Sequence, residues 1–118
     1  MPLRTTLFLM LSPTLAAADP ATVETIEARP GADGWTVSVT LRHGDTGWDD
    51  YADGWRVEAP DGTVLGTRTL LHPHVDEQPF TRSLSGVAIP DDLAEVRIRT
   101  SSSPEGWEEG TTPFTLPR

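Results

Sequence analysis

Residues 35–42, WTVSVTLR, alternate strictly between apolar and polar side chains, and this period of two is the pattern that most limits how the chain can fold. Apolar side chains at every second position lie on one face of an extended strand, which is typical of a strand with one buried face. The chain also has 11 prolines, which interrupt long helices. No segment shows sustained helical spacing. The pattern therefore predicts an all-β protein.

Similar extended runs follow one another along the chain and are separated by turn signals such as Pro60-Asp61-Gly62. Seven of them are expected to be strands, at residues 21–29, 35–42, 55–59, 63–71, 80–89, 93–100 and 111–116. Seven short strands in roughly 100 residues predict a single β-sandwich domain of the immunoglobulin type.

Two resemblances accompany this interpretation. The run SLSGVAIPDDLAEVRIRTSSSPEGW…TTPFTLP resembles the last three strands of a fibronectin type III domain, with Pro90 and the alternation of Val96 and Ile98 in the expected places. Ala94 stands where that family has a tyrosine, so the resemblance is architectural. The pattern GWxxYAD…HPHxxEQPFTRSL is similar to that of a set of small exported bacterial proteins of unknown function. This second resemblance covers most of residues 19–118 and implies no particular chemistry.

The first eighteen residues are expected to be a signal peptide. Arg4 gives a positive start, TLFLMLSPTLA gives an apolar stretch, and three alanines precede Asp19. The stretch is too short to span a bilayer. The chain has no cysteine, so a lipid anchor is not expected. We therefore predict a periplasmic or secreted domain comprising residues 19–118.

The charge of the chain limits its partners. The sequence has 18 acidic residues against 9 basic ones, a net charge of −9, and all the basic residues are arginines. Such a surface repels nucleic acid and anionic lipid, and favours a metal cation or a basic protein partner. The absence of cysteine, and of methionine beyond Met10, excludes a blue-copper site or a thioether copper carrier. The oligomeric state is left open.

Three connections hold most of the unusual residues. In an immunoglobulin-type sandwich, residues 43–54, 72–79 and 101–110 are expected to lie at one end of the domain. They contain all three histidines, two of the four tryptophans, the only tyrosine and no arginine. They also hold nine of the acids: Asp45, Asp49, Asp50, Asp53, Asp76, Glu77, Glu105, Glu108 and Glu109. This end is the predicted binding site.

The histidines suggest a metal site. In an extended segment His72 and His74 point to the same side, about 7 Å apart, and Pro73 stiffens the backbone between them. His43 would add a third imidazole. Three nitrogens, or two with a carboxylate, suit Zn²⁺ or Cu²⁺. The predicted metal ligands are therefore His72, His74, His43, Asp76, Glu77 and Asp45. Residues 45–54 do not match an EF-hand, so Ca²⁺ is the less favoured ion.

Two other interpretations of this end stay open. The histidines can be struts that hydrogen-bond within their loops. Alternatively, Trp48, Tyr51 and Trp107 can form an aromatic platform for a protein or glycan, whereas Trp35 and Trp55 are expected in the core. No G-x-S-x-G or other nucleophile motif is present, and there is no lysine or cysteine. The sequence therefore predicts an exported binding domain rather than an enzyme. Its favoured ligand is a divalent transition metal, and its alternative is a non-enzymatic immunoglobulin-like module for a protein or glycan.

Overall fold

The computed structural model describes residues 19–118, so the signal peptide predicted at residues 1–18 lies outside the described part. Residues 19–118 form an all-β structure without helices. No helix in this range is therefore available to cross a membrane. The strands are β1 (Thr22–Gly31), β2 (Gly34–Arg42), β3 (Tyr51–Glu58), β4 (Val64–Thr69), β5 (Phe80–Val87), β6 (Glu95–Ser103), β7 (Gly106–Trp107) and β8 (Thr112–Thr115).

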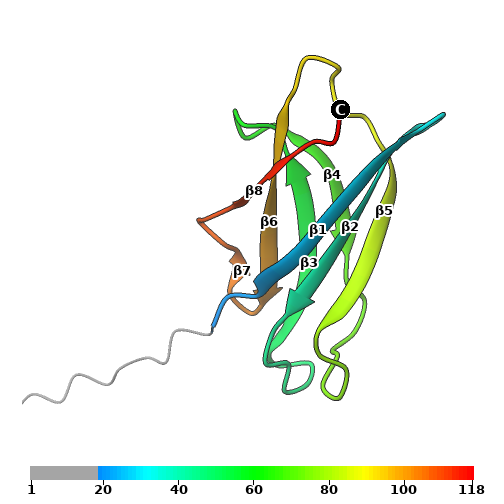
Figure 1. The fold of residues 1–118 in the computed structure, drawn as a ribbon. Helices are drawn as coiled ribbons and strands as arrows, with labels where there is room; N and C mark the ends of the chain where they lie inside the picture. Colours follow the sequence, from blue (N-terminus) through cyan, green and yellow to red (C-terminus); the bar gives the residue numbers. More distant parts are fainter. Residues whose placement is uncertain (1–18) are drawn as a thin grey trace, which may run out of the picture.

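The strands form two antiparallel sheets. One sheet has the order β1-β2-β5, and the other has the order β4-β3-β6, with both β7 and β8 pairing with β6. Figure 1 shows the two sheets as the two layers of a sandwich-like arrangement. Each layer keeps one polar face outward, as the alternation along residues 35–42 requires.

The core lies between the two sheets. Alternate residues of β2, from Trp35 to Leu41, are buried. They share one hydrophobic cluster with Trp55 and Val57 of β3 and with Val96 and Ile98 of β6. Both tryptophans expected in the core are therefore there, and Trp55 is fully buried. The expectation of an all-β chain is confirmed.

The strand boundaries differ from the expectation at the end that carries the unusual residues. Each of the seven expected segments overlaps one strand, and the two-residue β7 is additional. β3 starts at Tyr51 rather than at residue 55, because Tyr51 and Ala52 pair with Ser103 and Ser102 of β6. A bulge at Asp53 lets the sequence YADG continue the ladder. Part of two expected loops is thus sheet.

The remaining connections do meet at one end. Figure 1 shows the β2–β3 and β4–β5 connections side by side at the bottom of the domain, with the β6–β7 turn on the same side. The pairing of Tyr51 with Ser103 places the β6–β7 turn next to the β2–β3 connection. We call this end the loop end, comprising residues 43–51, 70–79 and 103–107.

Candidate functional site

A buried carboxylate organises the loop end. The side chain of Asp45 has no exposed surface. Its Oδ1 lies 2.6 Å from His43 Nδ1 and accepts the Ala52 N–H at 3.0 Å. Its Oδ2 accepts the His74 N–H at 2.7 Å. Because a carboxylate can only accept, the proton between Asp45 and His43 belongs to the histidine. Asp45 therefore connects the β2–β3 connection to β3 and to the β4–β5 connection.

A glutamine provides a second link between the same two connections. Gln78 Oε1 accepts the His43 N–H at 3.0 Å, and Gln78 Nε2 donates to the His74 carbonyl oxygen at 3.0 Å. Gln78 thereby ties the main chain of His43, in the β2–β3 connection, to that of His74, in the β4–β5 connection. Hydrogen bonds of this kind, partly shielded from water, help to hold a loop backbone in one conformation. We call Asp45, His43, His74 and Gln78 the loop hub.

His74 is buried against the first residue of β5. Its ring stacks on Phe80 with centroids 3.9 Å apart and an interplanar angle of 9°. The Arg82 guanidinium donates to Nε2 at 2.9 Å, so this nitrogen is the acceptor and the ring is neutral. Burial lowers the pKa of His74, and the positive charges of Arg82 and His72 lower it further. Nδ1 is buried 4.0 Å from Asp45 Oδ2 without a hydrogen-bond partner.

The other predicted ligands lie at different depths. His72 is exposed, its Nδ1 is 3.0 Å from the Pro73 carbonyl oxygen, and its ring centroid is 4.6 Å from that of His74. Asp76 and Glu77 are exposed. His43 Nε2 lies 3.7 Å from Asp50 Oδ1. The structure thus brings His72 beside His74, and joins His43 to the backbone of His74 through Asp45.

These six side chains do not surround one point. Within residues 19–118, no group of three or more His, Cys, Asp or Glu residues is arranged so that it could hold a metal ion. The hydrogen bonds of the loop hub match the strut interpretation for His43 and His74. His72 and the two exposed carboxylates of the same loop make no such bonds to another connection.

The predicted aromatic residues form two separate groups. Trp48 is 65% exposed and meets Tyr51 edge to face, with ring centroids 5.6 Å apart. Trp107, which is 41% exposed, lies under the Arg56 guanidinium at 4.3 Å and beside Gly54. Trp107 therefore belongs to the outer surface of the β3–β6–β7 sheet. Two aliphatic side chains of the loop end, Leu71 and Val75, are also exposed.

Two groups of polar contacts could not be predicted from the sequence. Gln78 and Arg82 bind His43 and His74, yet neither residue type stands out in the sequence. On the outer surface of the β4-β3-β6 sheet, the buried carboxylate of Glu58 binds both Arg56 and Arg99. The hydrogen bond from Arg99, followed by that from Arg56, lowers the pKa of Glu58 against the opposing effect of burial. Only the i, i+2 spacing of Arg56 and Glu58 hints at this pair.

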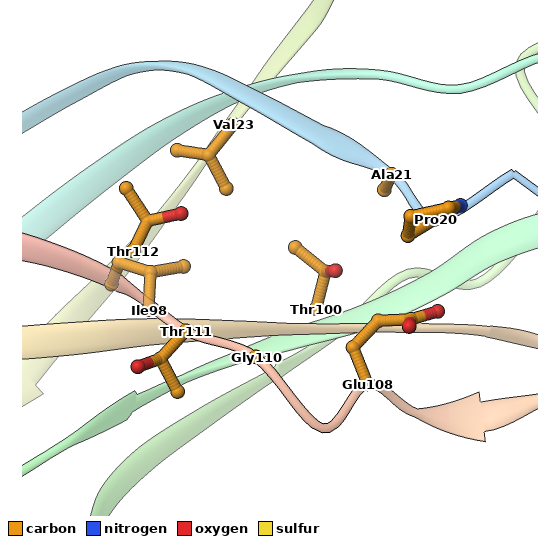
Figure 2. A pocket seen from close by; sticks show the side chains of 9 residues that line it. All are labelled: Pro20, Ala21, Val23, Ile98, Thr100, Glu108, Gly110, Thr111 and Thr112. Carbon is orange, nitrogen blue, oxygen red and sulfur yellow. The ribbon is translucent and has the colours of Figure 1, made fainter.

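A hollow lies outside the loop hub. It has a volume of about 260 Å³ and opens between the start of β1 and the β7–β8 segment. Figure 2 shows Val23 of β1 facing Ile98 and Thr100 of β6, with Glu108 and Thr112 on the remaining sides. Glu108 is one of the acids expected at the binding end, but none of the predicted metal ligands or aromatic residues lines the hollow.

Comparison with known proteins gives one likeness. No family model matches the chain, and no solved structure matches it. A protein of Halomicrobium mukohataei with the description "Putative lipoprotein" is 44% identical over 70 residues. The match covers 59% of this chain and 34% of that protein, so the chain corresponds to about a third of the length of the relative.

Proposed function

We propose that the chain is an exported, non-enzymatic binding module that recognises a basic protein partner through its loop end. The observation that carries the proposal is the exposed Trp48, which packs edge to face on the half-buried Tyr51 of β3 and lies on a connection that the buried Asp45 holds in place. Aromatic side chains of this kind supply much of the binding energy in protein interfaces.

The rigidity of the loop end supports this proposal. Ordering a mobile loop on binding costs free energy, and a loop that is already fixed avoids this cost. Asp45 and Gln78 fix the two connections that carry Trp48, Leu71 and Val75. The exposed apolar side chains are therefore displayed in a defined arrangement.

The charge of the loop end supports a basic partner. Its exposed side chains, and those just beyond it, include Asp49, Asp76, Glu77, Glu105 and Glu109. Negative side chains around an apolar centre speed association with a positive partner and exclude acidic ones. A polar rim around an aromatic centre is also the usual composition of an interface.

We further propose the finer fold and location. β2 lies between β1 and β5, and β3 lies between β4 and β6. This strand order supports an immunoglobulin or fibronectin type III-like sandwich. The description of the Halomicrobium mukohataei relative as a lipoprotein supports an exported or envelope protein, and we propose a periplasmic or secreted one.

Transition-metal binding is the second candidate function. It is favoured by the 4.6 Å separation of the His72 and His74 rings and by the exposed carboxylates of Asp76 and Glu77 on the same loop. Binding of Zn²⁺ or Cu²⁺ through Nε2 of His74 would require Arg82 to leave that nitrogen.

Selection of a phage-displayed random peptide library against the purified protein tests the first proposal. We expect enriched peptides to be rich in Arg and Lys, and the Trp48→Ala variant to bind them at least about tenfold more weakly. Val64→Ala, an exposed change on β4, is the matched control and should leave binding unchanged. Enrichment without charge preference, or binding that does not depend on Trp48, would reject the proposal. Binding to a glycan array that depends on Trp48 would replace the protein partner by a glycan.

A further inference from the structure

The outer side of β1 is a free strand edge. β1 pairs with β2 on one side, and no other strand of residues 19–118 pairs with it. Figure 1 shows β1 along the margin of its sheet, with the β1–β2 hairpin extending beyond the rest of the domain. An edge of this kind presents N–H and C=O groups that a further strand can bind.

The β1–β2 hairpin determines which main-chain groups are free. Gly31 pairs with Gly34 across a two-residue turn, so these two residues exchange the hydrogen bonds that close it. Bonded and non-bonded pairs then alternate along the ladder. Ile26, Ala28 and Pro30 therefore form the non-bonded pairs, and their main-chain groups point away from β2. Pro30 has no N–H, and at this position it removes no bond from the β1–β2 ladder.

Two opposite charges flank Ala28 on the outer face of the sheet. Glu27 and Arg29 lie opposite Ser38 and Thr36 of β2, and both side chains are exposed. None of the ion pairs of residues 19–118 includes either of them. A shallow hollow on the same surface is lined by Glu27, Ala28, Arg29, Thr36 and Ser38. The edge thus carries two charges without a partner beside a surface that can receive a side chain.

We propose that β1 pairs antiparallel with β1 of a second copy of this chain, with Ala28 on the twofold axis. In this register Glu27 of each copy lies opposite Arg29 of the other copy. These positions form non-bonded pairs of the new ladder, where side chains approach most closely. The Ala28 N–H and C=O groups bond reciprocally across the axis. Each Ile26 N–H donates to the Pro30 carbonyl oxygen of the other copy.

Neighbouring registers lack this complementarity. Centring the pair on Glu27 places the two Glu27 carboxylates opposite each other, and centring it on Arg29 does the same for the two guanidinium groups. Like charges directly opposite in a sheet are destabilising. If the twofold axis passed between two residues, outward-facing side chains of one copy would lie opposite core-facing side chains of the other. The alternation of side chains along a strand does not allow this arrangement. Centring on Ala28 is therefore the register that the charges select.

The proposed dimer joins the two β1-β2-β5 sheets into one continuous sheet. Because the two β1 strands run in opposite directions, the two loop ends point away from each other. This inference does not depend on what the loop end binds, since β1 contributes no residue to it.

Sedimentation equilibrium of the purified protein tests the proposal. We expect the average mass to rise with concentration from that of one chain to twice that value. Arg29→Glu and Glu27→Arg should each be monomeric, because each places like charges opposite across the axis. An equal mixture of the two variants should form a heterodimer, since every opposing pair then regains opposite signs. A wild-type protein that stays monomeric up to about 1 mM, a weak affinity on the usual scale, would overturn the proposal. Single variants that dimerise like the wild type would also overturn it.

Amide hydrogen exchange gives an independent measurement. We expect exchange at Ile26 and Ala28 to slow when the protein concentration is raised, while exchange along β4, an edge strand of the other sheet, stays constant. Ala28→Pro removes the outward N–H without removing a bond to β2, and should abolish dimerisation while circular dichroism remains that of the wild type. Equal slowing along β1 and β4, or an Ala28→Pro dimer, would show that β1 is not the interface.

Discussion

The main-chain N–H of His74 donates a 2.7 Å hydrogen bond to Oδ2 of Asp45, which precedes it by 29 residues. Through Oδ1 the same carboxylate binds His43 Nδ1 and the Ala52 N–H. One buried side chain therefore sets the position of the β4–β5 connection relative to the β2–β3 connection. The exposed side chains on both connections depend on it for their relative positions.

Asp45→Asn should destabilise the protein by about 2–3 kcal/mol, because an amide can supply only one oxygen for three donors and brings an NH₂ group toward N–H groups. Urea unfolding gives the free energy of unfolding. Asp76→Asn changes an exposed carboxylate of the same end and should shift the free energy by less than about 0.5 kcal/mol. Equal effects of the two changes would contradict the role of Asp45.

The free energy of unfolding should fall as the pH is lowered below 6.5, the ordinary pKa of a histidine. The pKa of His74 in the folded protein is below its ordinary value of 6.5, because the ring is buried and lies beside Arg82 and His72. Between the folded and unfolded pKa values the unfolded chain binds the extra proton, so protonation favours unfolding. The stabilisation is present above pH 6.5 and is lost as the pH falls toward the folded pKa. Unfolding free energies of wild type and His74→Gln, measured from pH 8 to pH 5, should differ in slope. Parallel curves would assign the pH dependence to other groups.

Salt should stabilise the protein. The chain carries a net charge of −9 and has no lysine, so its carboxylates repel one another in the folded state. Raising the NaCl concentration shortens the range of this repulsion to about 3 Å at 1 M. Thermal unfolding should therefore show a higher Tm in 1 M NaCl than in 0.05 M NaCl. A lower Tm in salt would mean that attractive ion pairs such as Arg99–Glu58 outweigh the repulsion.

The metal prediction can be tested by thermal unfolding of the metal-stripped protein with and without Zn²⁺ or Cu²⁺. An ion that binds only the folded state at 100 times its Kd stabilises it by about 2.7 kcal/mol, which raises Tm by about 10 °C or more. His72→Ala should abolish the increase, and Asp61→Asn, at a turn away from the loop end, should not. Ca²⁺ serves as the oxygen-preferring comparison. A Tm that no ion changes would leave the histidines as struts of the loop end.

The fold class could be predicted from the sequence because its signal is local. Trp35, Val37, Val39 and Leu41 alternate with polar residues, and all four are buried in β2. The convergence of the unusual connections at one end of the domain could also be predicted, because it depends on strand topology rather than on side-chain detail.

The details of the site could not be predicted, because they depend on contacts between residues that are distant in the chain. Ala52 is buried only because β3 continues to Tyr51 by pairing with Ser102 and Ser103, fifty residues later in the chain. The Arg82 guanidinium reaches Nε2 of His74 because the His74 ring stacks on Phe80 at the start of β5, two residues before Arg82. The spacing of His72 and His74 indicates that the rings lie near each other, but it does not indicate which nitrogen is already hydrogen-bonded.

The two loops are fixed largely through main-chain groups, since Asp45 accepts the N–H of Ala52 and of His74, and Gln78 binds the N–H of His43 and the carbonyl oxygen of His74. These contacts do not involve the exposed side chains of Trp48, Val75 or Asp76. Mutations at the exposed positions can therefore accumulate during evolution without loss of the loop backbone. The loop end is accordingly suited to diversification, and a randomised library at these positions should retain a folded scaffold while its members acquire different specificities.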